Sequence, residues 1–199
     1  MTRFSMIYLA SQSPRRSQLL TQLGIQHTLL LPGPEEDAEA LEDVLPGEAP
    51  KTYVQRVTDL KLQAALERLE RRGLAPAPVL CSDTTVALGR TILGKPADAK
   101  DAVRMLRALS GKTHRVLTSV AVGWAGQRVQ TCSESRVTFA EMSASEIQAY
   151  VESGEPMGKA GAYAVQGLAA EYIARISGSY TGIMGLPLFE TAQLLKRLA

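Results

Sequence analysis

The amino-acid sequence predicts an α/β fold with a central mixed, twisted β-sheet, flanked by helices and shared by two lobes around a groove. Near the N-terminus, apolar runs at 6–10 and 28–31 enclose a helical pattern, and such a βαβ unit favours parallel strands. Later, alternating segments at 113–123 and 127–139 flank a tight turn and predict an antiparallel pair. A sheet that contains both arrangements is mixed.

Length and composition indicate a globular protein with one domain over residues 1–199. The net charge is only +2, which gives no global field for nucleic acid or a membrane surface. No apolar run approaches the ~18 residues of a membrane span, and the short N-terminal run does not resemble a signal peptide. Two cysteines and two histidines do not favour a zinc site, so we expect a reduced, cytoplasmic setting.

The turn after the first predicted strand is rich in hydroxyl groups and is followed by two arginines. Ser13 is a suitable N-cap and Pro14 suits the first helical position. Arg15 and Arg16 then fall in the first turn, where the helix dipole disfavours cations. An anion held by the backbone N–H groups, Ser11, Ser13 and the arginines would account for this placement. The alternative is a capped surface helix with solvated arginines.

The segment 32–47 is acidic and contains proline and glycine, which predicts a long loop. Its carboxylates are either solvated or face a site and help to hold a cation. A helix is predicted from Pro50 to about Arg72. Lys61 on this helix is either solvated or reaches a site. The predicted apolar stripe of the helix is Tyr53, Val54, Val57, Leu60, Ala64 and Leu66.

Residues 79–83 have the pattern of a buried strand that ends in an acid, and 84–88 follow it. Gly89-Arg90 predicts a hairpin turn into 91–93. Asp83 would then lie at the carboxyl end of a central strand, where open α/β sheets place their ligands. An aspartate at that position can equally cap the following turn.

The remaining pattern predicts three helices and a strand around a glycine-rich loop. We expect helices at 97–109, at 143–151 with a Ser143–Glu146 capping box, and from Pro187 onward with Leu188, Thr191, Leu194 and Leu195 facing inward. The loop spans 154–167 and the strand 170–176. His27 and His114 are interpreted as structural.

Basic residues on separate elements suit the chemistry of polyphosphate hydrolysis. Lys95 follows the hairpin, and Lys159 lies in a flexible glycine loop. Cationic side chains neutralise phosphate charge, a divalent cation bridges phosphate oxygens, and a carboxylate orients or deprotonates water. Both lysines also fit plain turn or loop structure. A Walker-A loop and a Gly-x-Gly-x-x-Gly motif are absent from the expected places, which weakens the P-loop and dinucleotide-binding interpretations.

A series of short motifs extends along nearly the whole chain in a specific order. They are Ala10-Ser-Gln-Ser-Pro-Arg-Arg16, Ser82-Asp83-Thr84, Leu93-Gly-Lys-Pro96, Leu109-Ser-Gly-Lys-Thr-His114, Ser153-Gly-Glu-Pro156, Lys159-Ala-Gly-Ala-Tyr-Ala-Val-Gln-Gly167, Gly178-Ser-Tyr180 and Gly185-Leu-Pro187. In this order and combination they resemble the Maf family of nucleoside triphosphate pyrophosphatases.

The resemblance implies a deep cleft in a fold related to the inosine triphosphate pyrophosphatases. It also implies a hydrolase that cleaves between the α- and β-phosphates with a divalent cation (Mg²⁺, Mn²⁺ or Co²⁺), and a homodimer. The Lys-Ala-Gly-Ala-Tyr…Gln-Gly form resembles the dTTP/UTP branch, which would act on dTTP, UTP and modified pyrimidine nucleotides. Two alternatives are the 7-methyl-GTP branch and a nucleotide-binding regulator of septum formation.

The matching motifs assign roles to particular residues as implications of the resemblance. Asp83 would accept the proton and help to hold the metal. Glu36 best matches the family's glutamate in the acidic loop, although Glu35 competes for that position. Substrate choice would involve Arg15, Thr84 and Gln166, and phosphate contacts would involve Ser11, Ser13, Arg16, Lys61, Lys95 and Lys159.

The sequence departs from the family pattern at three places. Gly158 replaces an acid, Ala164-Val165 replaces Gly-Ile, and Thr181-Gly182 replaces Ser-Asn. These differences concern loop geometry and substrate preference more than the class of reaction.

Overall fold

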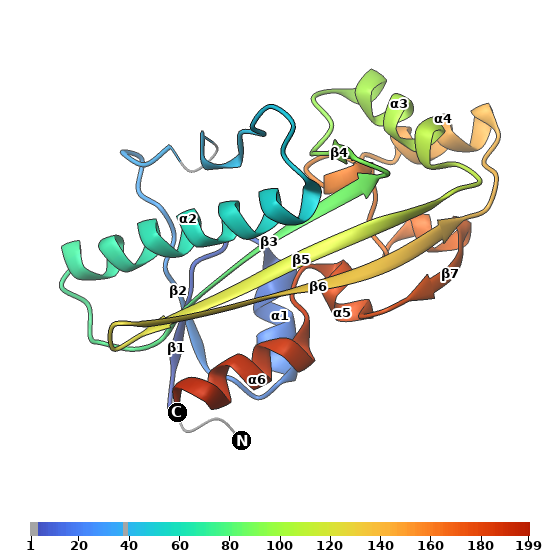
Figure 1. Cartoon of the computed structure of the whole chain (residues 1–199). Helices are drawn as coiled ribbons and strands as arrows, with labels where there is room; N and C mark the ends of the chain where they lie inside the picture. Colours follow the sequence, from blue (N-terminus) through green and yellow to red (C-terminus); the bar gives the residue numbers. More distant parts are fainter. Residues whose placement is uncertain (1–3, 38–39) are drawn as a thin grey trace.

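The computed structural model describes residues 4–37 and 40–199, and its central feature is one seven-stranded sheet (Figure 1). The strand order is β2-β1-β3-β5-β6-β7, and β4 pairs with β3. The strands are β1 (Ile7–Leu9), β2 (His27–Leu29), β3 (Val79–Leu88), β4 (Thr91–Leu93), β5 (Thr113–Trp124), β6 (Gln127–Phe139) and β7 (Ile173–Ser177).

The strand pairing confirms the predicted mixed sheet. Strand β1 runs parallel to both β2 and β3, whereas β3–β4, β3–β5, β5–β6 and β6–β7 are antiparallel. Helix α1 (Pro14–Gln22) connects β1 to β2, as the βαβ pattern predicts. Gly24 follows the end of α1 with a φ of 71°, a left-handed conformation that glycine adopts at low cost.

Helices cover both faces of the sheet. Helix α2 packs on one face over β3, β5 and β6, while α5 and α6 pack on the other face over β5 and β6 (Figure 1). Helices α3 and α4 pack together beyond β4. The helical bounds are α2 (Pro50–Arg71), α3 (Ala99–Leu109), α4 (Ala144–Glu152), α5 (Tyr180–Met184) and α6 (Leu188–Leu198), with short 3₁₀ helices η1 (Ala40–Glu42), η2 (Ala160–Ala162) and η3 (Leu168–Tyr172).

The alternation of side chains along β3 divides the core and positions the site. Leu80 packs with the core on the α1 and α6 face, whereas Val79 and Cys81 pack with Leu62 under α2. Because successive strand residues point to opposite faces, Asp83 falls on the α2 face of the sheet. Ser82 and Thr84 fall on the opposite face.

Several boundaries agree closely with the sequence prediction. The hairpin strands at 113–124 and 127–139 and the helix from Pro50 are confirmed. Ser143 and Glu146 form the predicted capping box at the start of α4. Both results follow from local signals, namely strand alternation and cap chemistry.

The predicted apolar stripe of α2 is correct only in its first half. Tyr53, Val54 and Val57 are buried, but Leu60 is exposed. A helical spacing of three or four residues from Val54 instead buries Thr58, Leu62, Ala65 and Arg68 against the sheet. The prediction followed apolar residue type, whereas the buried face follows the helical period and therefore includes the polar residues Thr58 and Arg68.

Two other expectations need correction, and one short helix lies outside the prediction. Asp83 lies in the middle of one continuous ten-residue strand, not at its carboxyl end. The predicted strand at 170–176 divides into η3 and β7. The short helix α5 has too few residues for a periodic signal and was not predicted. In the described part of the chain, no helix is long and apolar enough to cross a membrane.

Candidate active site

A cleft of about 930 Å³ opens along an unpaired edge of β3. On this side of β3, β1 pairs with Val79 and Leu80, and β4 pairs with 86–88. The edge of β3 between these two partners, 81–85, borders the cleft. A strand edge without a neighbour lets a ligand approach side chains on both faces of the sheet, and this explains how Asp83 and Thr84 can line one cleft.

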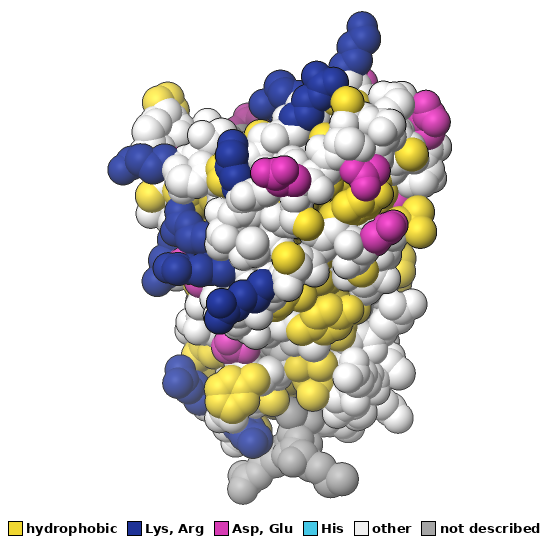
Figure 2. Space-filling model, turned by 90° about the vertical axis from the view of Figure 1, so that its right-hand side faces the viewer, with side chains coloured by type: hydrophobic (Ala, Val, Ile, Leu, Met, Phe, Trp, Pro, Cys, Tyr) yellow, Lys and Arg dark blue, Asp and Glu magenta, His cyan; other side chains and the backbone are white. Residues whose placement is uncertain are grey.

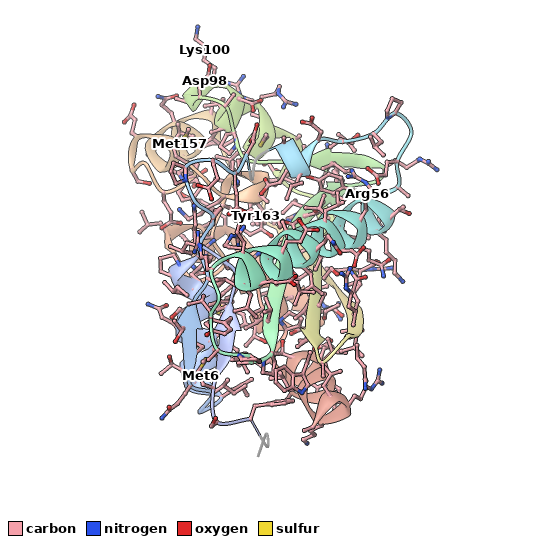
Figure 3. All side chains as sticks on the ribbon, turned by 90° about the vertical axis from the view of Figure 1, so that its left-hand side faces the viewer. Met6, Arg56, Asp98, Lys100, Met157 and Tyr163 are labelled. Atoms are coloured by element: carbon pink, nitrogen blue, oxygen red, sulfur yellow. The ribbon has the colours of Figure 1, made fainter. Side chains whose placement is uncertain are left out.

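The walls of the cleft come from segments far apart in the sequence. The turn between β1 and α1 and the acidic loop form one side, and the glycine-rich loop and the segment 183–185 form another. In Figure 3, Met157 lies in the upper part of the molecule and Tyr163 lies near its middle, and both line the cleft. The site therefore forms only when the chain has folded.

Asp83, Lys61, Glu42 and Lys95 form a charge network, with Lys61 and Glu42 at its centre. Lys61 Nζ lies 2.6 Å from Asp83 Oδ1 and 2.7 Å from Glu42 Oε1. Lys95 Nζ lies 3.2 Å from the other oxygen, Glu42 Oε2. Burial raises the pKa of Glu42, but the two ammonium groups outweigh this effect and lower it. The negative charges of Asp83 and Glu42 thus balance the positive charges of Lys61 and Lys95, two of the lysines expected to contact phosphates.

Arg16 connects the turn after β1 to the far wall of the cleft. Its Nε donates to the carbonyl oxygen of Gly185 at 2.8 Å, and its Nη1 donates to Ser11 Oγ at 2.9 Å. Its Nη2 lies 3.5 Å from Thr84 Oγ1. Burial lowers the pKa of Arg16, although Asp83 opposes this shift. An arginine remains charged under all ordinary conditions, so the site holds a fixed, oriented cation.

The neighbouring groups of this turn are less constrained. Arg15 Nε lies 3.4 Å from the carbonyl oxygen of Met184. Ser11 Oγ also accepts from the backbone N–H of Ser13 at 3.2 Å. Ser13 occupies the N-cap position of α1, but its side chain makes no capping hydrogen bond. The first turn of α1 therefore presents hydroxyl, guanidinium and backbone donors at the cleft, an arrangement suited to an anion.

Hydroxyl groups of β3 and β5 bond to α5 and to the residue directly after it. Thr84 Oγ1 and Thr118 Oγ1 are 3.0 Å apart, and Thr118 Oγ1 donates to the carbonyl oxygen of Gly182 at 2.7 Å. Ser82 Oγ lies 3.0 Å from the carbonyl oxygen of Gly185. The sequence motif at 185–187 indicated this segment, but Thr118 carried no sequence signal because only strand pairing places it beside Thr84.

Glu36 lines the cleft but is engaged by arginines of α2. Arg68 Nε lies 2.9 Å from Glu36 Oε1, and Arg68 Nη2 lies 2.5 Å from Glu36 Oε2. Arg71 Nη2 lies 2.8 Å from Glu36 Oε1. The hydrogen bond from Arg68 is the main reason that the pKa of Glu36 falls to about 2. Glu35 is exposed and lies 3.3 Å from Arg71.

The acidic-loop carboxylate beside Asp83 is therefore Glu42, which the sequence did not single out. It lies in η1, within a segment that contains many other acids, so no residue pattern distinguishes it. The metal role predicted for Glu36 stays a prediction.

The glycine-rich loop brings Lys159 and Gln166 to the cleft. Gly158 has a φ of 72°, a conformation that favours glycine over the acid usual in the family. A Cβ added to Gly161 would lie 2.8 Å from Val86, so this glycine allows the loop to contact β3 closely. Burial and Arg15 lower the pKa of Lys159. Gln166 is exposed at the cleft.

His114 supports this loop from within the core. Its Nε2 lies 2.8 Å from the Tyr163 hydroxyl, and both rings pack edge-on against Phe139. Burial lowers the pKa of His114 to about 4. The neutral imidazole therefore has the structural surroundings expected from the sequence. His27 contacts Ser17 and the backbone of Ile25.

The carboxylates of the cleft suit a hard cation such as Mg²⁺ only when substrate phosphates supply further oxygen ligands. Over residues 4–37 and 40–199, no three His, Cys, Asp or Glu side chains gather as a metal-binding group. Mg²⁺ is commonly held by one or two carboxylates plus substrate phosphates. Asp83 and Glu42 supply two carboxylates next to a cationic turn, and this combination fits a metal–polyphosphate complex.

The chain is similar to known proteins over nearly its whole length. A family model described as "Maf-like protein" matches residues 6–198. A protein named dTTP/UTP pyrophosphatase from Albidiferax ferrireducens is 71% identical over 190 residues, which cover 96% of this chain and 95% of the relative. A protein of the same name from Polaromonas sp. is 68% identical over 190 residues, covering 96% and 94%.

Among solved structures, a nucleoside-triphosphatase / dITP/XTP pyrophosphatase from Mycobacterium abscessus matches with a TM-score of 0.42 and 16% identity. The match covers 69% of this chain and 75% of that one.

Proposed function

The chain belongs to the Maf-like protein family, and from that premise we propose that it is a dTTP/UTP pyrophosphatase. It would convert a nucleoside triphosphate and water into the nucleoside monophosphate and pyrophosphate. One observation carries the proposal beyond the family: Asp83 lies at the open edge of β3, beside three elements that bear cationic side chains. This position supports the proposal that Asp83 acts as a proton acceptor beside a bound polyphosphate.

The cationic residues would bind and orient the triphosphate. Arg16 is held by Gly185, Ser11 and Thr84, so its guanidinium needs little reorganisation to meet a phosphate. Lys61 and Lys95 carry ammonium groups on flexible stems and can turn from Glu42 toward phosphate oxygens. Their charge would stabilise the pyrophosphate as it leaves.

Asp83 would act as the general base. It would accept a proton from the water that attacks the α-phosphorus, while the bond from the α-phosphorus to the bridging oxygen breaks and pyrophosphate departs. Lys61 holds the Asp83 carboxylate in place at 2.6 Å. A divalent cation held by Asp83 and Glu42 would supply charge neutralisation for the phosphates.

The glycine-rich loop would form the base-binding end of the cleft. The Gln166 amide offers both a donor and an acceptor, which matches the edge of a uracil or thymine ring. Thr84 and Arg15 line the same cleft. In this assignment, pyrimidine selection depends on Gln166, Thr84 and Arg15, none of which belongs to the charge network of Asp83, Lys61, Glu42 and Lys95.

A nucleotide panel tests the proposed activity. We expect pyrophosphate release from dTTP and UTP to exceed release from CTP, GTP and 7-methyl-GTP, with Mg²⁺, Mn²⁺ or Co²⁺ present. A preference for 7-methyl-GTP would move the chain to the other branch. Absence of hydrolysis combined with salt-sensitive binding to DNA would favour the septum-regulator alternative.

Asp83→Asn tests the catalytic assignment. The amide cannot accept a proton but keeps an oxygen for Lys61, so we expect the fold to remain and kcat to fall about 10³-fold. Asp59→Asn, on the exposed side of α2, provides a matched control with the same chemical change. Pyrophosphate release at the wild-type rate from the folded Asp83→Asn variant would require another base.

Cytoplasmic location and a homodimer are part of the same proposal. In the face shown in Figure 2, Lys and Arg side chains gather mainly along the left side, next to apolar and acidic side chains. Light scattering at micromolar concentration measures the oligomeric state directly.

A further inference from the structure

Glu155 joins both ends of the glycine-rich loop, although no role at the site has been assigned to it. One carboxylate oxygen accepts from the Tyr150 hydroxyl at 2.8 Å and from the backbone N–H of Ala169 at 3.4 Å. The other accepts from the backbone N–H of Leu168 at 2.9 Å. Tyr150 is buried in α4, so the carboxylate connects a fixed helix to the first residues of η3.

Gly167 leaves the space in which this carboxylate lies. A Cβ added to Gly167 would lie 2.3 Å from Glu155 Oε2, much closer than atoms can approach. The φ of Gly167 is −109°, so the position tolerates a side chain in its backbone conformation. The glycine is therefore needed for the close approach of Glu155 and not for the shape of the backbone.

Lys159 and Gln166, the polar residues that the loop presents to the cleft, both lie between Glu155 and Leu168, which the Glu155 carboxylate joins. Gln166 directly precedes Gly167, and the backbone N–H of Gly167 bonds to the carbonyl oxygen of Ala164. Lys159 Nζ donates to the backbone carbonyl oxygen of Glu155 itself. Lys159 is thus bonded to the backbone of Glu155, and Gln166 lies two residues before Leu168, which the Glu155 carboxylate holds.

The ionised carboxylate suits this task. Burial raises the pKa of Glu155, but hydrogen bonds from Leu168, Tyr150 and Ala169 outweigh burial and lower it. A charged acceptor makes stronger hydrogen bonds to backbone N–H groups than a neutral one. A glutamine at this position would present one amide oxygen and two donors, so it cannot accept from both Tyr150 and Leu168 in the same way.

We propose that Glu155 is the positioning residue for base selection, because it holds the segment 158–169 in the conformation that places Gln166 at the base end of the cleft. The inference rests on the proposed function, since it gives a structural cause for the choice among pyrimidine triphosphates. Glu155 acts through Gln166 and does not itself contact the substrate.

Two variants test the proposal from opposite sides of the contact. Glu155→Gln removes the charged acceptor, and Gly167→Ala displaces the carboxylate while leaving Glu155 in the chain. In both we expect the kcat/KM ratio of UTP over CTP to fall about tenfold, mainly through a higher KM for UTP. Glu152→Gln, near the end of α4, makes the same chemical change on an exposed residue and should keep the wild-type ratio.

Hydrogen exchange provides a readout that does not depend on turnover. We expect the amides of 158–169 to exchange faster in both variants, while the amides of β3 and β5 keep their wild-type protection. A purely structural role would instead lower protection throughout the sheet and reduce activity toward UTP and CTP equally.

The outcomes separate the inference from the proposed function. If wild-type protein hydrolyses neither dTTP nor UTP, the proposed function fails. If it hydrolyses both, and either folded variant keeps the wild-type UTP/CTP ratio, Glu155 does not position the base-selecting loop. A lower kcat/KM ratio of UTP over CTP in both variants, together with faster amide exchange confined to 158–169, supports the proposal.

Discussion

The two ends of the cleft are built from different kinds of interaction. At the proposed phosphate end, ion pairs link Asp83 on β3, Lys61 on α2, Glu42 in the acidic loop and Lys95 after β4. At the base end, Gln166 is exposed on a glycine-rich loop supported by Glu155 and the neutral His114–Tyr163 pair. The proposed phosphate end is thus held by ion pairs between side chains, whereas the proposed base end depends on one carboxylate, Glu155, that accepts from backbone N–H groups and a tyrosine hydroxyl.

This difference follows from what each end must recognise. Every nucleoside triphosphate carries the same phosphates, so a rigid arrangement of charges serves all substrates. Bases differ by single donors and acceptors, and selection among them depends on the position of a few hydrogen-bonding groups. Mutations at the phosphate end should therefore affect all substrates alike, and mutations at the base end should change their ratio.

Arg16→Lys is expected to have the largest effect of the variants that probe this contrast. A lysine cannot span Gly185, Ser11 and the phosphate with one ammonium group, so kcat/KM should fall about 100-fold for UTP and CTP alike. Steady-state kinetics with both nucleotides measure the change. A decrease in kcat/KM for only one of the two nucleotides would show that Arg16 takes part in base selection, and the two ends of the cleft would then not have separate roles.

Glu42→Gln should have an intermediate effect, and it concerns the cation. Losing one of two carboxylates is expected to raise the Mn²⁺ concentration for half-maximal activity about tenfold, with the UTP/CTP ratio unchanged. A Mn²⁺ titration at saturating UTP measures this shift, and Asp43→Asn in the same loop is the control. An unchanged Mn²⁺ requirement with a lower KM would mean that Glu42 only competes with phosphates for Lys61 and Lys95.

The smallest effect is expected at His114 and depends on pH. The pKa of His114 is about 4 in the folded chain and near 6.5 when unfolded, so the unfolded state binds the proton first as the pH falls. Between pH 7 and pH 5.5 this should lower the free energy of unfolding by about 1 kcal/mol. This contribution of His114 to the free energy of unfolding is present above pH 6.5 and is lost progressively as the pH falls toward 4.

His114→Gln removes the titrating group and keeps a partner for Tyr163. We expect urea unfolding of this variant to show a smaller decrease between pH 7 and pH 5.5 than the wild type shows. Glu36 contributes little in this range because it is ionised in both states: its pKa is about 2 in the folded chain and 4.5 when unperturbed. An equal decrease in both proteins would mean that His114 is not the source of the acid sensitivity.

Much of the fold follows from local sequence signals. The βαβ unit, the hairpin of β5 and β6, the helix from Pro50 and the Ser143 cap each depend on periodicity or capping within a short segment. Boundaries were less predictable where the signal was short or polar, as for α5 and for Arg68 on the buried face of α2.

The sequence by itself determined the fold class, the family and the residue types of a polyphosphate site, because these depend on patterns within motifs. Only the tertiary structure decided which carboxylates and cations meet. Glu42 lies beside Asp83 while Glu36 pairs with Arg68, and Asp83 lies mid-strand at an edge left open between β1 and β4. The physical reason is that ion pairs and open strand edges arise from long-range packing, which leaves no periodic trace along the chain.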